Sequence, residues 1–207
     1  HLVDCLEPDE EFNVVRFQQM AKEAMKGIYD RGRIPVLVGG TGFYIQAVTG
    51  DIDFTVHGED TTYRQMLEEK AKTEGAQVLH EMLAAVDPAS AAAIHTNNVK
   101  RVIRALEYYR QTGKPISQHN EEQRQKESPY NLAYFVLNDE RTRLYERIDA
   151  RIDQMLADGL IDEVKRLKKM GYHKGMVSMQ GLGYKEILSY LDGTWSVSYT
   201  HLRAHET

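Results

Sequence analysis

Apolar residues recur at helical spacing through the first part of the chain and then give way to a short continuous apolar run. From Val14 to Ile28 they return every three or four residues, which predicts an amphipathic helix ending at Gly32. Residues 33–38 read Arg-Ile-Pro-Val-Leu-Val, which is typical of a strand buried on both faces. A glycine turn and a helix over 43–48 follow. This order predicts an α/β fold with a parallel sheet, whose ligands bind at the carboxyl ends of the strands.

After Gly50 the pattern changes, and strand-like runs almost disappear as far as Lys126. Helical spacing predicts helices over residues 62–75, 76–85, 88–95 and 98–112. We therefore expect an all-helical domain, residues 56–128, inserted into an α/β core that is formed by residues 1–55 and 129–195.

The chain beyond the predicted insertion returns to a mixed pattern. A strand is predicted over 130–137. Three helices are predicted after it. The first begins at residue 139 or 142 and runs to 158, and the other two cover 161–169 and 183–191. Residues 196–207 have no apolar face, and we predict that they are a non-native tail such as a read-through segment. His201 and His205 lie four residues apart there, but with no third ligand they do not predict a metal site.

Composition and charge restrict the class of protein. The 207 residues carry 26 Lys and Arg against 31 Asp and Glu, a net charge of −5, and 42% of them are hydrophobic. Such a chain can bury a core, and its apolar runs are too short to cross a bilayer. We expect a cytoplasmic monomer without a membrane partner. The acidic average also argues against indiscriminate binding to nucleic acid, so basic residues gathered on one face are informative.

The glycine turn is the first candidate site. Gly40 and Thr41 lie between the predicted strand and the next helix, where backbone N–H groups and a hydroxyl can bind an anion. A tight turn in which the glycines serve steric purposes alone is an equally good interpretation. The turn is not a Walker loop, because no Lys-Ser or Lys-Thr pair follows at the required offset.

A second candidate is a row of arginines on the predicted helix over 142–158. Arg143, Arg147 and Arg151 are spaced four residues apart beside an apolar seam. Guanidinium groups suit forked contacts with a diphosphate or a nucleic-acid backbone. The alternative, which the pattern alone slightly favours, is a solvated face whose arginines pair with neighbouring carboxylates.

The third candidate lies in the predicted helical insertion. Lys100, Arg101 and Arg104 share one side of a helix, and Val102 and Ile103 lie on the other. A basic face anchored by an apolar one suits contact with a phosphate backbone, although three charges are also common on ordinary surfaces.

The fourth candidate is a glycine-containing turn over residues 179–185 that leads into a helix. Gln180, Tyr184 and Lys185 could contact bases or phosphates there. The alternative is a helix start that only requires a flexible backbone.

Five ordered motifs resemble the bacterial tRNA dimethylallyltransferase, or IPP transferase, family. They are residues 39–41 after 33–35, 100–107, 113–115, 144–151 and 180–185. The opening residues 1–4 are also similar to the family, and the correspondence runs to about Asp192. The resemblance implies a P-loop-NTPase-like parallel sheet core with a tRNA-gripping helical insertion.

Members of this family transfer a dimethylallyl group from dimethylallyl diphosphate to N6 of the adenine immediately 3′ of the tRNA anticodon, assisted by Mg²⁺. The resemblance implies that Thr41 and Arg151 are catalytic. We assign no metal ligand, and the sequence leaves open whether Mg²⁺ is held by the protein or only by the diphosphate. It assigns diphosphate binding to Gly40, Thr41, Arg147 and Arg151. It assigns contact with the anticodon stem-loop to Thr41, Arg64, Lys100, Arg101, Val102, Ile103, Arg104, Gln180, Gly181, Leu182, Gly183, Tyr184 and Lys185.

The chain departs from the family pattern at both ends. The family's Walker-type loop and its general-base aspartate precede the position of His1, and a further tRNA-binding helix follows that of Asp192. We therefore expect a truncated chain that does not catalyse transfer alone. The alternatives are an adenylate isopentenyltransferase acting on free nucleotide, a non-catalytic tRNA-binding module and a nucleotide kinase.

Overall fold

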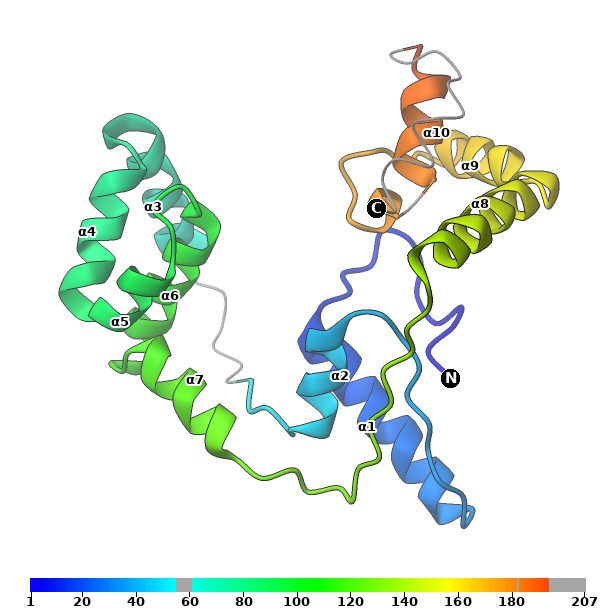
Figure 1. The fold of residues 1–207 in the computed structure, drawn as a ribbon. Coiled ribbons are helices and arrows are strands. Elements are labelled where there is room, and N and C mark those ends of the chain that lie inside the picture. The colour runs from blue at the N-terminus through cyan, green and yellow to red at the C-terminus, as the bar shows by residue number, and fades with distance from the viewer. Residues whose placement is uncertain (55–60, 182, 194–207) are drawn as a thin grey trace. The chain divides into compact units, whose positions relative to one another are not determined.

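The computed structural model describes residues 1–54, 61–181 and 183–193, and Figure 1 shows these as helices joined by irregular segments. The chain divides into two compact units. The central unit is Val14–Leu132, and the split unit combines His1–Asn13 with Ala133–Thr207. Within the described ranges, no helix has both the length and the apolar character needed to cross a membrane.

Helices provide the regular structure in the described part of the central unit. In chain order they are α1 (Val14–Asp30), α2 (Gly42–Thr49), α3 (Thr61–Glu74), α4 (Ala76–Val86), α5 (Pro88–Ala93), α6 (Val99–Thr112) and α7 (Ile116–Gln125). The predictions for α1 to α6 are confirmed to within a few residues at the helix ends. Helix α7 was not predicted, because it buries no residue and so has no apolar face in its sequence.

Helices α3 to α6 pack around one apolar core, and together with α7 they form what we call the helical block. The buried core side chains are Leu67, Leu79, Leu83, Ala91, Val102, Ile103, Ala105 and Leu106. Burial of each larger side chain contributes about 1.5–3 kcal/mol. The core therefore supplies a firm support for the outward faces of these helices.

Asp87 is a polar anchor inside the helical block and is only 1% exposed. Its carboxylate accepts a hydrogen bond from the Ser90 N–H at 3.0 Å, which caps α5. It also accepts bonds from the Ser117 N–H at 3.0 Å and the Ser117 hydroxyl at 2.6 Å. Burial opposes ionisation, but the hydrogen bonds from Ser117 and Ser90 outweigh it and hold the pKa of Asp87 below its ordinary value. Asp87 thus ties α7 to the junction of α4 and α5.

Helices α1 and α2 form a pair through both polar and apolar contacts. The buried Gln18 side chain donates hydrogen bonds to the carbonyls of Ala47 at 2.7 Å and Ile52 at 2.8 Å. The rings of Phe17 and Tyr44 lie 4.9 Å apart between centroids. The helix that follows the glycine turn is therefore fixed on α1.

The split unit is built on a second, smaller core. Its helices are α8 (Arg141–Ala157), α9 (Leu160–Lys169), the 3-10 helix η1 (Ser178–Gln180) and α10 (Tyr184–Leu191). The predictions for α8, α9 and α10 are confirmed. The buried core side chains are Leu160, Val164, Met179, Ile187 and Leu188. The Ser178 hydroxyl donates to the Pro8 carbonyl at 2.6 Å and holds the first segment of the chain on η1.

The predicted strands are not observed in the described chain. Residues 33–38 and 130–137 have no regular structure, and Ile34, Val36 and Val38 are 86%, 80% and 92% exposed. A strand in a parallel sheet needs neighbours that take up its backbone hydrogen bonds and cover its faces. The described residues include no such strand. The P-loop-NTPase-like sheet is therefore not confirmed here, whereas the helices of the predicted insertion are present.

Candidate nucleic-acid interface

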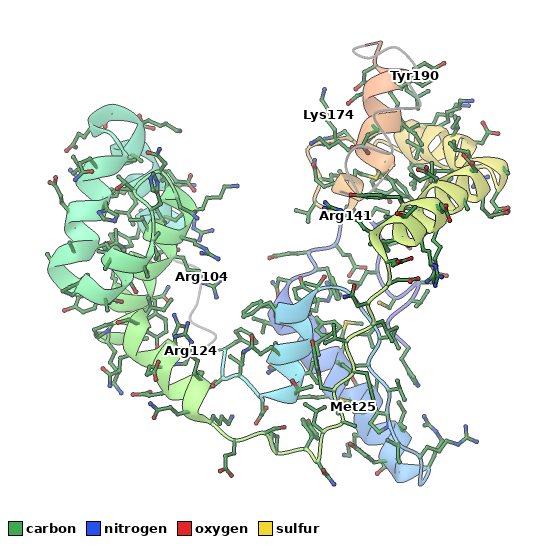
Figure 2. All side chains as sticks on the ribbon, viewed as in Figure 1. Met25, Arg104, Arg124, Arg141, Lys174 and Tyr190 are labelled. Atoms are coloured by element: carbon green, nitrogen blue, oxygen red, sulfur yellow. The ribbon has the colours of Figure 1, made fainter. Side chains whose placement is uncertain are left out.

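The basic face of α6 is formed by Lys100, Arg101 and Arg104, which are all exposed as predicted. Figure 2 shows the Arg104 side chain projecting outward from the helix. Val102 and Ile103 are 0% and 3% exposed, so their side chains anchor α6 in the core and do not face a ligand. Among the residues that the structure describes, no carboxylate forms an ion pair with any of the three cations. This face therefore carries positive charge that the described chain does not neutralise.

Several other cations in the helical block pair with carboxylates. Arg64 forms a forked pair with Glu107 of α6, with N–O distances of 3.0 and 2.8 Å. Lys72 lies 3.6 Å from Glu69 within α3. The expected contact of Arg64 with tRNA stays a prediction, because its side chain is half exposed and already joins α3 to α6.

An aromatic pair continues the basic face and was not singled out in the sequence. Tyr108 lies one turn beyond Arg104 on α6, and its ring centroid is 5.3 Å from that of His119 on α7. Aromatic rings beside cations can stack on unpaired RNA bases. The spacing of four residues places Tyr108 on the same side of α6 as Arg104, and this could have been seen in the sequence. The position of His119 could not, because it depends on how α7 packs.

In the glycine turn, the Thr41 side chain is exposed and there is free space beside Gly40. Thr41 precedes α2, and its exposed side chain makes no capping hydrogen bond, whereas its carbonyl accepts one from the Tyr44 N–H at 3.0 Å. Apart from its two chain neighbours, no described residue has an atom within 4 Å of the place where a Cβ on Gly40 would stand, and its φ is not positive. The described chain therefore gives no steric reason for this glycine. The open space suits close approach by a ligand.

The arginines of α8 differ in their pairing. Arg143 lies 3.7 Å from Glu140 and Arg147 lies 3.3 Å from Asp139, so both follow the solvated-face interpretation. Arg151 is exposed, and no ion pair joins it to another described residue. The predicted diphosphate set is divided between the central and split units, and its assembly stays a prediction.

Hydrogen bonds involve two of the described residues in the turn before α10. Gly183 has a φ of +85°, which an L side chain rarely adopts, and its N–H donates to the Glu186 carboxylate at 3.0 Å. The side-chain amide of Gln180 donates to the carbonyl of Lys174. Lys185 is exposed at the start of α10. The start of α10 thus presents one exposed lysine.

Tyr184 connects this turn to α9. Its hydroxyl donates to the Glu163 carboxylate at 2.5 Å. Burial, the hydrogen bond and the negative charge of Glu163 raise the pKa of Tyr184 to about 12. The phenol therefore serves first to position the turn. Leu182, which was also assigned to tRNA contact, lies outside the described residues.

Replacing Tyr184 by phenylalanine should lower the free energy of unfolding by about 1 kcal/mol at neutral pH. The phenol keeps its proton to a higher pH in the folded than in the unfolded chain. The stabilisation of the folded chain by this phenol is therefore complete below pH 10 and is lost as the pH rises from about 10 towards 12. Urea unfolding at pH 7 and above pH 10 measures both effects. Tyr190→Phe, at an exposed position of the same helix, is the matched control and should change neither value.

The described residues were compared with the ligand sets that bind metal ions in proteins. Within the described ranges, no group of three His, Cys, Asp or Glu side chains could hold a metal ion. The predicted tail with His201 and His205 lies outside those ranges.

Comparison with known proteins identifies the family. The family model described as IPP transferase matches residues 1–206. The chain belongs to the IPP transferase family. Over 200 residues, 97% of the chain, it is 61% identical to the tRNA dimethylallyltransferase of Lachnoclostridium phytofermentans, and it covers 64% of that protein. The chain thus spans less than two thirds of the length of this relative.

Two solved structures of the same kind are similar in fold. The full-length tRNA isopentenylpyrophosphate transferase of Bacillus halodurans is 42% identical, with a TM-score of 0.63; the alignment covers 99% of this chain and 63% of that protein. A eukaryotic dimethylallyltransferase acting on tRNA is 26% identical, with a TM-score of 0.80, and the alignment covers 99% of this chain and 52% of that protein. The described helices of this IPP transferase chain therefore share the fold of solved tRNA isopentenyltransferases.

Proposed function

We propose that this chain is part of a tRNA dimethylallyltransferase, which moves a dimethylallyl group from its diphosphate to N6 of the adenine next to the 3′ side of the anticodon. The observation that carries the proposal is the un-neutralised basic face of α6 in a chain that belongs to the IPP transferase family. A free nucleotide has no need of such a face, because only a polynucleotide presents a row of phosphates to it.

The proposed transfer makes one bond, breaks another and moves a proton. The N6 amine forms a bond to C1 of the dimethylallyl group, the bond from C1 to the diphosphate oxygen breaks, and the N6 proton passes to a base. An exocyclic amine is a weak nucleophile, so the reaction needs that base, neutralisation of the departing diphosphate and exclusion of water. By resemblance, the base is an aspartate, and none of the candidate residues named above takes that role.

Residues of this chain would serve the remaining tasks. The open turn at Gly40 and the free hydroxyl of Thr41 would contact the diphosphate and the reacting groups. Arg151, with Arg147 nearby on α8, would neutralise the leaving diphosphate. The target adenine must also leave its stack to enter such a site. Mg²⁺ would come with the diphosphate and offset part of its charge.

The sheet belongs to the same proposal. Residues 33–38 and 130–137 would be strands of a P-loop-NTPase-like sheet, in which their exposed apolar side chains would be covered. The predicted domains, residues 1–55 with 129–195 and residues 56–128, would then be the catalytic core and the tRNA-gripping insertion. We expect the 207-residue chain to bind tRNA without modifying it.

Substitution of Arg151 in a transfer-competent natural form of the protein tests whether this arginine neutralises the leaving diphosphate. Arg151→Ala should slow transfer by about tenfold, the effect of losing one charge-assisted hydrogen bond, and should leave the affinity for tRNA unchanged. Single-turnover transfer and equilibrium binding measure the two quantities. Arg143→Ala is the matched control, because that arginine is paired on the same helix. Equal and negligible effects of both substitutions would restore the solvated-face interpretation.

A further inference from the structure

The chain that enters the helical block and the chain that leaves it are joined by hydrogen bonds. The backbone N–H of Asp53, shortly after α2, donates to the side-chain carbonyl of Gln123 on α7 at 2.9 Å. The carbonyl of Asp53 lies 3.1 Å from Nε2 of His119, also on α7. Both backbone groups of one residue are thus held by side chains that lie far along the sequence.

Asp51 is the centre of a second set of contacts. Its carboxylate pairs with the ammonium of Lys22 on α1 and lies 3.2 Å from the ammonium of Lys126, just after α7. Lys126 also donates to the Asp51 carbonyl at 2.5 Å, and the Ser128 hydroxyl donates to the Thr49 carbonyl at 2.6 Å. One carboxylate therefore joins α1 to the chain that leaves the helical block.

We call this set the clasp. Its side chains come from Lys22, Asp51, His119, Gln123, Lys126 and Ser128. A single exposed ion pair stabilises a protein by little, but a carboxylate shared by two cations and supported by bonds to the backbone acts as a network. The hydrogen bond from Lys22 is the strongest influence that holds the pKa of Asp51 below its ordinary value.

We propose that Asp51 is a positioning residue whose clasp fixes the helical block relative to the pair α1 and α2. Thr41 immediately precedes α2, and the basic face lies on α6 within the block. The clasp would then set the separation between the RNA-holding face and the reacting end of the site. This consequence rests on the proposed function, whereas the clasp itself does not.

Distance measurement between spin labels tests the clasp without RNA. Labels are placed on exposed positions of α1 and α4, through Lys26→Cys and Ala84→Cys in a Cys5→Ser background. The chain with an intact clasp should give one narrow distance distribution by pulsed electron paramagnetic resonance. Asp51→Asn should lose that narrow peak. Asparagine tolerates the positive φ of +48° at this position, so the substitution removes charge without adding backbone strain.

Matched variants separate positioning from general destabilisation. Lys126→Met should broaden the distribution as Asp51→Asn does and leave the melting of the helices unchanged, and Lys126→Arg should restore the narrow peak. Lys114→Met is the control, because that lysine is exposed and pairs with no carboxylate within the described ranges. An unchanged narrow distribution in both Asp51→Asn and Lys126→Met would overturn the clasp.

The consequence for RNA is tested in a transfer-competent form of the protein. Lys126→Met should lower the rate of transfer from bound tRNA and leave tRNA affinity unchanged, and Lys126→Arg should restore the rate. A broadened distance distribution with an unchanged rate would overturn the positioning role. Failure of the unmodified protein to bind tRNA would overturn the proposed function. The spin-label distances measured without RNA would still show whether the clasp fixes the helical block.

Discussion

Replacing Asp87 by alanine is expected to lower the free energy of unfolding of the helical block by about 3 kcal/mol. The substitution removes the cap of α5, which contributes about 1–2 kcal/mol. It also leaves the N–H and the hydroxyl of Ser117 without their acceptor, at a further cost of about 1–3 kcal/mol. Helix α7 should lose protection first, because it buries no residue of its own. Urea unfolding followed by circular dichroism and amide hydrogen exchange of α4 to α7 measures both effects.

The pH dependence identifies the carboxylate as the cause. The pKa of Asp87 is lower in the folded chain than in the unfolded chain, so its stabilisation is complete above about pH 4, the ordinary pKa of an aspartate. The stabilisation is lost as the pH falls from there through the folded pKa. The difference between wild type and Asp87→Ala should shrink over the same range. Glu68→Ala, at an exposed position of α3, is the control; if it destabilised the block as much as Asp87→Ala, the anchoring role would be wrong.

Reversing two charges on the basic face, with Lys100→Glu and Arg104→Glu together, is expected to weaken binding of an anticodon stem-loop RNA by about a hundredfold or more at low salt. Each reversal removes one favourable interaction with a phosphate and introduces repulsion. The double variant should also have a smaller salt dependence, with the log–log slope reduced by about 0.7–0.9 for each phosphate that is no longer neutralised. Fluorescence anisotropy of a labelled stem-loop over a range of salt concentrations gives both values.

The matched control separates local interactions from total charge. Lys72→Glu combined with Arg124→Glu changes the net charge by the same amount, but these cations pair with carboxylates of their own helices. This control should reduce RNA affinity only slightly. A control that weakened binding as much as the double variant on α6 would show that overall charge, and not the basic face, determines RNA binding.

The helices could be predicted because their signals are local. Helix α6 has apolar residues on one side, basic residues on the other and Gly113 with a φ of +69° just beyond its end. Helix α7 could not be predicted, since Asp87 and Ser117, which fix it, lie 30 residues apart. The apolar runs at 33–38 and 130–137 predicted strands, but a strand forms only beside another strand. No pattern within a run supplies that neighbour.

Part of the candidate site could also be predicted, because its signal is local. Helical spacing placed Lys100 and Arg104 together on one exposed face, and the structure confirms that placement. The pairing of Arg64 with Glu107 joins residues 43 positions apart, so no local pattern revealed that this arginine is occupied. The clasp around Asp51 was missed for the same reason, because its partners come from α1 and from the end of the helical block.

The most direct test of the proposed function is a competition for labelled dimethylallyl diphosphate between tRNA and free AMP, with a transfer-competent natural form of the protein. We expect the label to appear on N6 of the adenine 3′ of the anticodon and AMP to stay unlabelled. Lys100→Glu with Arg104→Glu should abolish labelling at low tRNA concentration. Faster labelling of AMP than of tRNA would identify a transferase for free nucleotide. The absence of label from both substrates would contradict the transferase proposal.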